Sequence, residues 1–246
     1  MTAPVFLTDP ERPPAPGRFV LDGPEGRHAV SVRRLRAGEE IVLTDGRGTG
    51  GYGTVAAVEG KDRLEAEITE VRHEPEPSPR ITVVQALPKG DRGELAVETM
   101  TETGVDAVVP WPASRCITQW KGERGVKALG KWRATAREAG KQARRLRLPE
   151  VPGPMSTREV AGLLADAAFA AVLHEEAAEP LATAVLPESG GIVLVVGPEG
   201  GVSPDELAAF TAAGAKPYRL GPTVLRTSTA GTAAAALLLG RTGRWS

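Results

Sequence analysis

The sequence predicts an α/β protein of two domains, the first rich in β-strands and the second built on a parallel sheet. Up to about Arg72, short apolar or alternating runs are separated by glycine turns, as in a small β-domain. Beyond residue 80, strand-like and helix-like segments alternate, which is typical of a parallel sheet with crossover helices. Three prolines within residues 75–79 favour an extended spacer. We therefore expect domains at residues 1–73 and 80–246, joined by a linker at residues 74–79.

Composition limits the chemistry that the chain can support. Hydrophobic residues make up 41% of the 246 residues, and aromatic residues only 4%, so aliphatic side chains must fill the cores. The formal net charge is −1, so a nucleic-acid-binding surface has to come from local clustering of basic residues. Cys116 is the only cysteine, which excludes an intrachain disulfide. The three histidines lie far apart in the sequence, and we expect no metal site.

We expect neither a membrane-spanning segment nor an export signal. No apolar run approaches the roughly 18 residues of a membrane-spanning helix. The N-terminal segment contains Asp9, Glu11 and Arg12 and lacks the apolar core of a signal peptide. We therefore expect a cytoplasmic protein with no membrane partner.

In the first domain we expect strands at residues 18–21, 40–44, 53–58 and 64–71, closed into a small barrel that hides the sheet edges. Residues 26–38 are predicted to form a helix that carries four arginines, two of which, Arg33 and Arg34, are adjacent. These two side chains either contact RNA phosphates or form a solvated helix face, and the residues alone favour neither interpretation.

The first half of the second domain has the expected alternation of strand and helix. We predict strands at residues 80–87 and 105–110 around a helix at residues 94–103 that ends at Gly104. A further helix at residues 157–165 precedes a strand at residues 169–173, which ends beside His174. His174 is as compatible with a surface position at a strand end as with a ligand contact.

The segment from Lys121 to Arg147 predicts an amphipathic helix with a basic face. Ten basic residues are opposed there only by Glu123 and Glu138, while alanines, leucines and Trp132 share the other side. A run of charge is usually a solvated face, but such faces usually mix both signs. We therefore predict RNA contacts at four of its basic residues: Arg137, Lys141, Arg144 and Arg145.

Two glycine turns near the C-terminus predict the ligand site. The β-branched run at residues 192–196 ends in Gly197-Pro198-Glu199-Gly200-Gly201, and a second strand at residues 217–220 ends in Gly221-Pro222. Ser203 and Glu206 form a capping-box signature for the helix after the first turn, and an alanine-rich helix follows the second. In open α/β sheets, ligands bind beyond the carboxyl ends of the strands. The Walker and dinucleotide-binding patterns are absent. Because proline removes backbone donors, these loops suit a neutral polar edge such as adenine better than a phosphate.

These turns carry a resemblance to a known family. The segment Val196–Gly201 with Ser203 and Glu206, then Leu220-Gly221, Leu225-Arg226-Thr227 and Thr229-Ala230, resembles the RsmE family. The resemblance extends weakly to the first domain, at His28, Arg33, Arg34 and Gly38, and to the region from Lys89 to Gly104. The long basic helix departs from the family pattern, because Lys141 and Ala143 stand where the family has glutamate and serine.

The resemblance implies a fold, a reaction and a set of partners. The fold is a C-terminal α/β domain of the SPOUT class with a deep trefoil knot, preceded by a small PUA-like RNA-binding β-barrel. The reaction is S-adenosyl-L-methionine-dependent methylation of uridine N3 in 16S ribosomal RNA, with the assembled small subunit as substrate and a homodimer as the active form. The residues that it implies for the cofactor are Leu173, His174, Val196, Gly197, Pro198, Gly200, Gly201, Leu220, Gly221, Leu225, Thr229 and Ala230.

Two side chains in the turns are candidates for catalysis. Glu199 could serve as a general base if burial raised its pKa, or it could accept hydrogen bonds from backbone N–H groups and shape the loop. Arg226 could stabilise the enolate that forms as N3 loses its proton, or it could pair with Glu199 and pin the loop.

Two rival functions remain at this stage. One is a knotted methyltransferase that acts on another RNA or another position, and the other is a ribosome-assembly factor without catalytic activity. The second rival would not need two ligand-binding glycine turns. If the turns form the pocket, Gly197→Val or Gly201→Val should abolish cofactor binding while the fold remains largely intact.

Overall fold

The structure is a computed structural model that describes residues 3–245, and it consists of two compact units. The first unit contains the chain up to Glu76 together with Gly140–Leu148, and the second contains Pro77–Ala139 and the chain from Pro149 onward. The change of unit after Glu76 lies within the expected linker. The expected second domain was continuous, whereas the structure assigns Gly140–Leu148 to the first unit.

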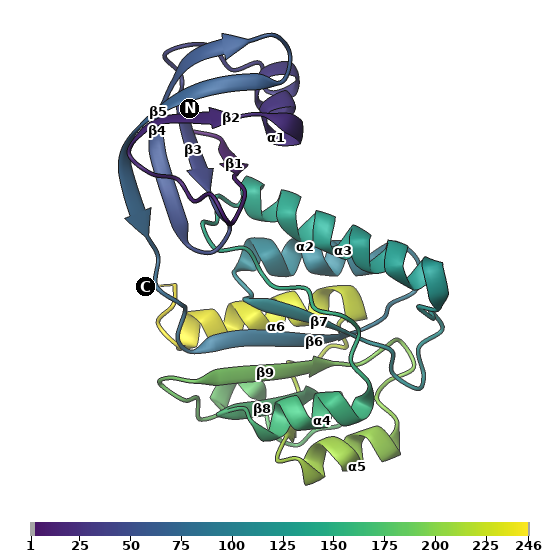
Figure 1. The fold of residues 1–246 in the computed structure, drawn as a ribbon. Helices are drawn as coiled ribbons and strands as arrows, with labels where there is room; N and C mark the ends of the chain where they lie inside the picture. Colours follow the sequence, from purple (N-terminus) through teal and green to yellow (C-terminus); the bar gives the residue numbers. More distant parts are fainter. Residues whose placement is uncertain (1–2, 246) are drawn as a thin grey trace. The chain divides into compact units, whose positions relative to one another are not determined.

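The first unit is built on a five-stranded mixed sheet (Figure 1). Its order is β1-β3-β4-β5-β2, with β1 parallel to β3 and the other pairs antiparallel. The two edge strands are short. The alternating burial in the first half of β5 places one face of the sheet on an apolar core that includes Phe6, Ile41 and Leu64. The strands are β1 Val5–Leu7, β2 Gly17–Leu21, β3 Glu40–Thr44, β4 Thr49–Glu59 and β5 Arg63–His73.

The predicted continuous helix at residues 26–38 is wrong. The chain forms a short helix α1 (Gly23–Arg27), then one π-helical segment η1 (His28–Val32), and turns at Arg34 with a left-handed φ of 57°. A Cβ on Gly26 would lie 2.2 Å from the backbone oxygen of Asp62, so this helix approaches a neighbouring loop that the local sequence does not reveal. Arg33 and Arg34 are exposed at the turn that ends the π-helical segment.

Lys141 is buried, which contradicts its predicted place on an outward basic face. Its Nζ lies 3.0 Å from Oε1 of Glu25, which is also buried, and Oε2 of Glu25 accepts a hydrogen bond from the Leu7 N–H at 3.2 Å. A helical projection places Lys141 beside the solvent-exposed basic side chains of the helix. In the structure, however, its ammonium group contacts Glu25. Lys141 is therefore an internal ion-pair partner and cannot reach an RNA phosphate.

The remainder of Gly140–Leu148 is also fixed within the first unit. The Thr44 hydroxyl donates to the Leu146 carbonyl at 2.9 Å, and the Leu146 side chain packs against Val5 and Val42. Of the other predicted RNA contacts, Arg144 is exposed and Arg145 is half-buried in this unit, while Arg137 is exposed in the second unit.

The second unit contains a five-stranded parallel sheet in the order β10-β8-β9-β6-β7. The strands are β6 Arg80–Ala86, β7 Ala107–Trp111, β8 Phe169–Leu173, β9 Gly191–Val196 and β10 Lys216–Tyr218. The central strands β6 and β9 are almost wholly buried, which explains their continuous apolar runs. Figure 1 shows these two strands side by side in the middle of the sheet, so segments more than a hundred residues apart form its core.

Helices accompany the strands of the parallel sheet. Gly104 ends α2 with a left-handed φ of 112°, as the sequence predicts, and α2 packs against the C-terminal helix α6. The long helix α3 begins in the second unit, and its last residues belong to the first. The helices are α2 Arg92–Thr103, α3 Gly122–Gln142, α4 Thr157–Ala165, the 3-10 turn η2 Leu181–Thr183, α5 Pro204–Ala212 and α6 Thr227–Arg241.

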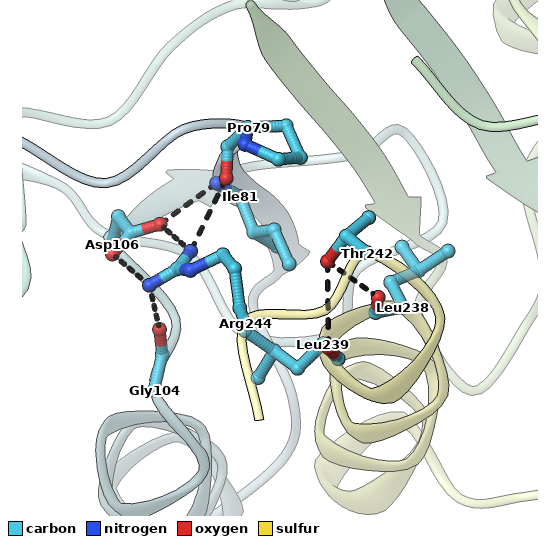
Figure 2. A network of polar contacts seen from close by, with 8 residues as sticks. All are labelled: Pro79, Ile81, Gly104, Asp106, Leu238, Leu239, Thr242 and Arg244. Atoms are coloured by element: carbon cyan, nitrogen blue, oxygen red, sulfur yellow. Dashed lines mark hydrogen bonds and ion pairs between the residues drawn. The ribbon is translucent and has the colours of Figure 1, made fainter. Parts of the chain in front are cut away.

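An ion pair anchors the chain after α6 to the amino-terminal edge of the sheet (Figure 2). The Arg244 guanidinium binds both carboxylate oxygens of Asp106 and also donates to the Pro79 carbonyl at 3.3 Å. Asp106 in turn accepts the Ile81 N–H at 2.8 Å. The pair has low exposure, 18% for the Arg244 side chain and 5% for that of Asp106, so it fixes the end of the chain beside the starts of β6 and β7.

We expect Arg244→Ala to destabilise the second unit by about 3 kcal/mol, because it leaves the buried Asp106 carboxylate without its cation. Urea unfolding measures this loss. Arg80→Ala is the control, since Arg80 pairs with Glu150 in the same unit at a site where the two side chains are 41% and 71% exposed. The control should lose at most about 1 kcal/mol. Equal losses in the two variants would contradict a structural role for the Arg244 pair.

Candidate active site

A cleft of about 1440 Å³ lies at the carboxyl edge of the parallel sheet in the second unit. Strands β6, β8, β9 and β10 are neighbours and run in the same direction, so the loops that follow them meet at this edge. The cleft is lined by the loop after each of these four strands and by the first residues of α2 and α6. The residues predicted for cofactor binding that line it are Leu173, His174, Val196, Gly197, Pro198, Gly200, Gly201, Leu220, Gly221, Leu225 and Ala230.

Thr229 is the one predicted cofactor residue that is not part of the lining. It stands in the first turn of α6, and its hydroxyl donates to the Arg226 carbonyl at 3.2 Å. This contact gives Thr229 a local structural role.

The first glycine turn has a tight conformation of its own. The Gly201 N–H donates to the Pro198 carbonyl at 2.8 Å, and Gly201 has a left-handed φ of 72°. A Cβ on Gly197 would lie 2.9 Å from the Val202 side chain. A valine at Gly197 or Gly201 would therefore distort the loop itself, so neither substitution tests cofactor binding cleanly.

Glu206 fixes the helix that follows this turn. The capping box predicted for α5 is present, since the Ser203 hydroxyl accepts the Glu206 N–H and the Glu206 carboxylate accepts the Ser203 N–H. The same carboxylate accepts the Ser114 N–H at 2.7 Å. Burial acts to raise the pKa of Glu206, but the hydrogen bonds from Ser114 and Ser203 outweigh it and hold the pKa below its ordinary value.

Stability should depend on the charge of Glu206. Because its pKa is lowered in the folded state, the stabilisation is complete above the unfolded-state pKa, near 4.5, and is lost as the pH falls through the folded-state value. We expect Glu206→Gln to lose about 1–2 kcal/mol at pH 7, with the deficit shrinking in acid, as measured by urea unfolding at several pH values.

Glu159 offers a matched control for this prediction. It forms the same capping box with Ser156 at the start of α4, but it is exposed, and within residues 3–245 it accepts no hydrogen bond from a distant loop. Glu159→Gln should have the smaller effect at pH 7. A deficit of Glu206→Gln that is the same at every pH would contradict the assignment.

The Glu199 side chain is exposed and shapes the loops. Its carboxylate accepts the backbone N–H of Lys89 at 3.1 Å, which joins the loop after β9 to the loop after β6. On the other side, Nη1 of Arg115 donates to the Gly200 carbonyl at 3.0 Å. The hydrogen bond from Lys89 is the kind of contact expected if Glu199 shapes its loop. A general base would need a buried carboxylate, whereas the Glu199 side chain is exposed.

Arg226 is the residue immediately before α6 and lines the cleft with an exposed side chain. Its carbonyl accepts the N–H groups of Thr229 and Ala230, each at 2.9 Å, so its backbone is fixed. In the part of the chain that the structure describes, its guanidinium forms no ion pair, and Glu199 binds the Lys89 amide instead. The alternative of an Arg226–Glu199 pair is therefore not realised.

His174 lies at the end of β8 and is half-buried in the lining of the cleft. Its Nδ1 accepts the Glu176 N–H at 3.2 Å, which fixes the ring in a turn and requires Nδ1 to be unprotonated. Its backbone N–H donates to the Tyr218 carbonyl at 2.9 Å. His174 therefore shapes the turn and also faces the ligand space.

The cleft is also lined by charged residues outside the predicted site. Arg92, Arg115 and Arg219 join Lys89 and Arg226 in the lining, where Asp91, Glu175, Glu176 and Glu199 oppose them. Arg115 and Arg219 lie just beyond strand ends, and Arg92 begins a helix after one, so their positions relative to the strands could have indicated them.

The described residues offer neither a metal-binding cluster nor a membrane-spanning helix. Within residues 3–245 there is no group of three or more histidine, cysteine or acidic side chains that could hold a metal ion. No helix in the same range is both long and apolar enough to cross a membrane.

Comparison with protein families first defines the class. Residues 74–239 match the family described as RNA methyltransferase domain, and residues 21–69 match the family described as RNA methyltransferase PUA domain. The chain is therefore an RNA methyltransferase-type protein with an N-terminal PUA-like β-domain and a C-terminal parallel α/β domain of the SPOUT type.

Individual relatives then define the family. The chain is 46% identical to ribosomal RNA small subunit methyltransferase E of Mycobacterium tuberculosis over 249 aligned positions, which cover 100% of this chain and 94% of the relative. It is 28% identical to the Bacillus subtilis protein of the same name, over 86% of each chain. The chain belongs to the family of ribosomal RNA small subunit methyltransferase E, the RsmE family.

Two solved structures resemble the whole chain. The Neisseria gonorrhoeae ribosomal RNA small subunit methyltransferase E bound to S-adenosyl methionine has a TM-score of 0.84 and 31% identity, over 98% of each chain. A Legionella pneumophila protein in complex with the bound cofactor SAM has a TM-score of 0.86 and 27% identity, also over 98% of each chain.

Proposed function

We propose that this protein transfers a methyl group from S-adenosyl-L-methionine to N3 of a uridine in 16S ribosomal RNA. The observation that carries the proposal is the cleft, in which two glycine turns and the start of α6 meet at the carboxyl edge of the parallel sheet. Its support from outside the chain is the family, whose relatives are named for methylation of small-subunit ribosomal RNA and include a structure with the cofactor bound.

The residues of the cleft fit this cofactor. Leu173, Val196, Leu220 and Leu225 provide apolar contacts for an adenine ring. The glycine turns expose backbone N–H and carbonyl groups that can bind its polar edge, and Gly221 leaves open space, since a Cβ there would meet no heavy atom within 4 Å. When bound, the sulfonium group supplies a methyl group that is already strongly electrophilic.

The protein must then position the uracil base and allow its N3 to lose a proton. A uridine must be unpaired or flipped out of a helix for its N3 to reach the cleft. N3 gives its proton to solvent water and forms a bond to the methyl carbon as the carbon–sulfur bond breaks, which leaves S-adenosylhomocysteine. As the proton leaves, negative charge develops on O2 and O4 of the base. The Arg226 guanidinium is the unpaired cation at the start of α6 that can stabilise this charge, and we assign it that role. Glu199 serves chiefly to hold its loop against the Lys89 amide.

Binding of the RNA involves both units. Arg33, Arg34 and Arg144 are exposed cations of the PUA-like unit, and Arg145 there is half-buried, while Arg137 is exposed on α3. We assign phosphate contacts to these five residues. The proposed substrate is RNA in the assembled small subunit, which places the protein in the cytoplasm.

A trefoil knot and a homodimer complete the proposal. On α6, Ala234, Ala235, Leu238 and Leu239 are buried within the unit, so a dimer contact on this helix would use Ala233, Ala236 and Leu237, which are half-buried. Light scattering during gel filtration tests the dimer.

Mass spectrometry of nucleosides from small-subunit RNA tests the reaction. RNA from cells that lack the gene should lose 3-methyluridine, and restoring the gene should return it. Unchanged 3-methyluridine with loss of another methylated nucleoside would indicate a different target position. If no methylated nucleoside changed, the protein would be a non-catalytic assembly factor, and the proposal would be wrong.

A further inference from the structure

Gln85 is a fully buried amide near the carboxyl end of β6. Its Nε2 donates to the adjacent Ala86 carbonyl at 3.0 Å and to the Thr227 carbonyl at 3.3 Å. Thr227 is the first residue of α6, 142 positions further along the chain. The amide therefore connects a central strand of the sheet to the first turn of the helix that follows Arg226.

The two carbonyls determine how the amide is oriented. Exchanging its oxygen and nitrogen would set Oε1 against two carbonyl oxygens, so Nε2 must face them. Among the residues that the structure describes, Oε1 has no hydrogen-bond partner. It lies beside Gly231 of α6, where a Cβ would come within 3.5 Å of Oε1 and 2.7 Å of the Met100 sulfur.

Packing alone does not explain an amide at this position. A buried polar oxygen without a partner opposes folding, and a methionine of similar length would fill the same space without that penalty. A methionine could make neither hydrogen bond, and of the two only the one to Thr227 joins β6 to another element. The function of the amide is therefore to be sought at the start of α6.

We propose that Gln85 is a positioning residue of the methyl-transfer site, which holds the first turn of α6 so that Arg226 stands in the cleft. The proposal rests on the function proposed above. Arg226 precedes Thr227 directly, and its carbonyl accepts the N–H groups of Thr229 and Ala230. A first turn tethered to β6 through Thr227 therefore fixes the backbone from which the guanidinium extends. Gln85 itself does not line the cleft and acts through Arg226.

Gln85→Met tests the proposal, because it keeps the volume and removes both donors. We expect kcat to fall at least about ten-fold, because a small misplacement of a catalytic group has effects of this size, while the Kd for the cofactor changes less than about three-fold. Hydrogen exchange read by mass spectrometry should accelerate at the amides of Thr229 and Ala230, which bind the Arg226 carbonyl.

Thr232→Val is the matched control. The Thr232 hydroxyl lies 2.6 Å from the Thr99 hydroxyl and joins α6 to α2 about one turn further along. Its loss should lower stability without reducing kcat more than about two-fold, since the first turn of α6 remains tethered.

Two results would overturn the proposal. One is a Gln85→Met enzyme with kcat within about two-fold of the unsubstituted enzyme, and the other is an equal loss of kcat in Thr232→Val, which would mark a general effect of helix packing. If the unsubstituted protein methylated no RNA, the proposed function would fail. In that case, unchanged hydrogen exchange at the amides of Thr229 and Ala230 in Gln85→Met would still show that Gln85 does not hold the first turn of α6.

Discussion

Arg226→Ala is expected to lower kcat for RNA methylation by about 100-fold to 1000-fold, the size of effect that follows removal of a group that stabilises developing negative charge. The guanidinium lines the cleft at the start of α6 and forms no ion pair within residues 3–245. Its backbone is held by the first helical turn. The cation is thus available in the ground state for the base, and its contribution should grow as charge develops on the uracil ring.

Single-turnover kinetics with saturating RNA and cofactor measure this effect apart from binding. Calorimetry with S-adenosylhomocysteine should give a Kd within about three-fold of the unsubstituted enzyme, because the proposed cofactor contacts lie on the glycine turns and not on Arg226. Arg226→Lys keeps the charge but loses the planar donors, so it should recover only part of the rate.

Arg219→Ala is the control for Arg226, since it removes the same charge from the lining of the same cleft. We expect it to lower kcat less than about five-fold, because Arg219 follows β10 and is not assigned a contact with the base, and solvent screens charges in an open cleft. If both variants lost activity equally, the positive charges of the cleft would act only through their summed electrostatic potential. Arg226 would then not be a catalytic residue.

The sequence predicts much of the second unit because its signals are local. The β-branched run at residues 192–196 forms β9, and Ser203 and Glu206 form the capping box of α5. Parallel neighbours place their following loops at one edge of the sheet, so two glycine turns recognised separately line the same cleft.

The errors arise where a distant contact determines the local structure. The segment at residues 26–38 has helical periodicity, but Gly26 packs against the backbone of Asp62, the helix changes to a π-helical segment at His28, and the chain turns at Arg34 with a left-handed φ. Lys141 has the sequence pattern of an exposed basic residue, but it is buried and pairs with Glu25, which lies 116 residues away in the sequence. Neither partner can be identified from periodicity or charge counts.

Gly221→Val is expected to abolish cofactor binding without changing the fold. A Cβ at Gly221 would meet no heavy atom within 4 Å, and its φ lies outside the left-handed range that disfavours a side chain. The residue is exposed and lines the cleft, so the valine side chain would extend into the space where the adenosyl group is proposed to bind. We expect the Kd for S-adenosyl-L-methionine to rise at least about 100-fold, which corresponds to about 2.8 kcal/mol.

Gly153→Val is the matched control for Gly221, because Gly153 is also an exposed loop glycine with open space around its Cβ and no left-handed φ, but it lies outside the cleft. Calorimetric titration and thermal unfolding of both variants separate binding from folding. Both should keep Tm within about 2 °C, and only Gly221→Val should lose the cofactor. Normal affinity in Gly221→Val would show that the cofactor does not bind against the loop after β10, because a valine side chain and a ligand cannot occupy the same space. The assignment of the second glycine turn to the cofactor would then fail, even if the RNA were still methylated.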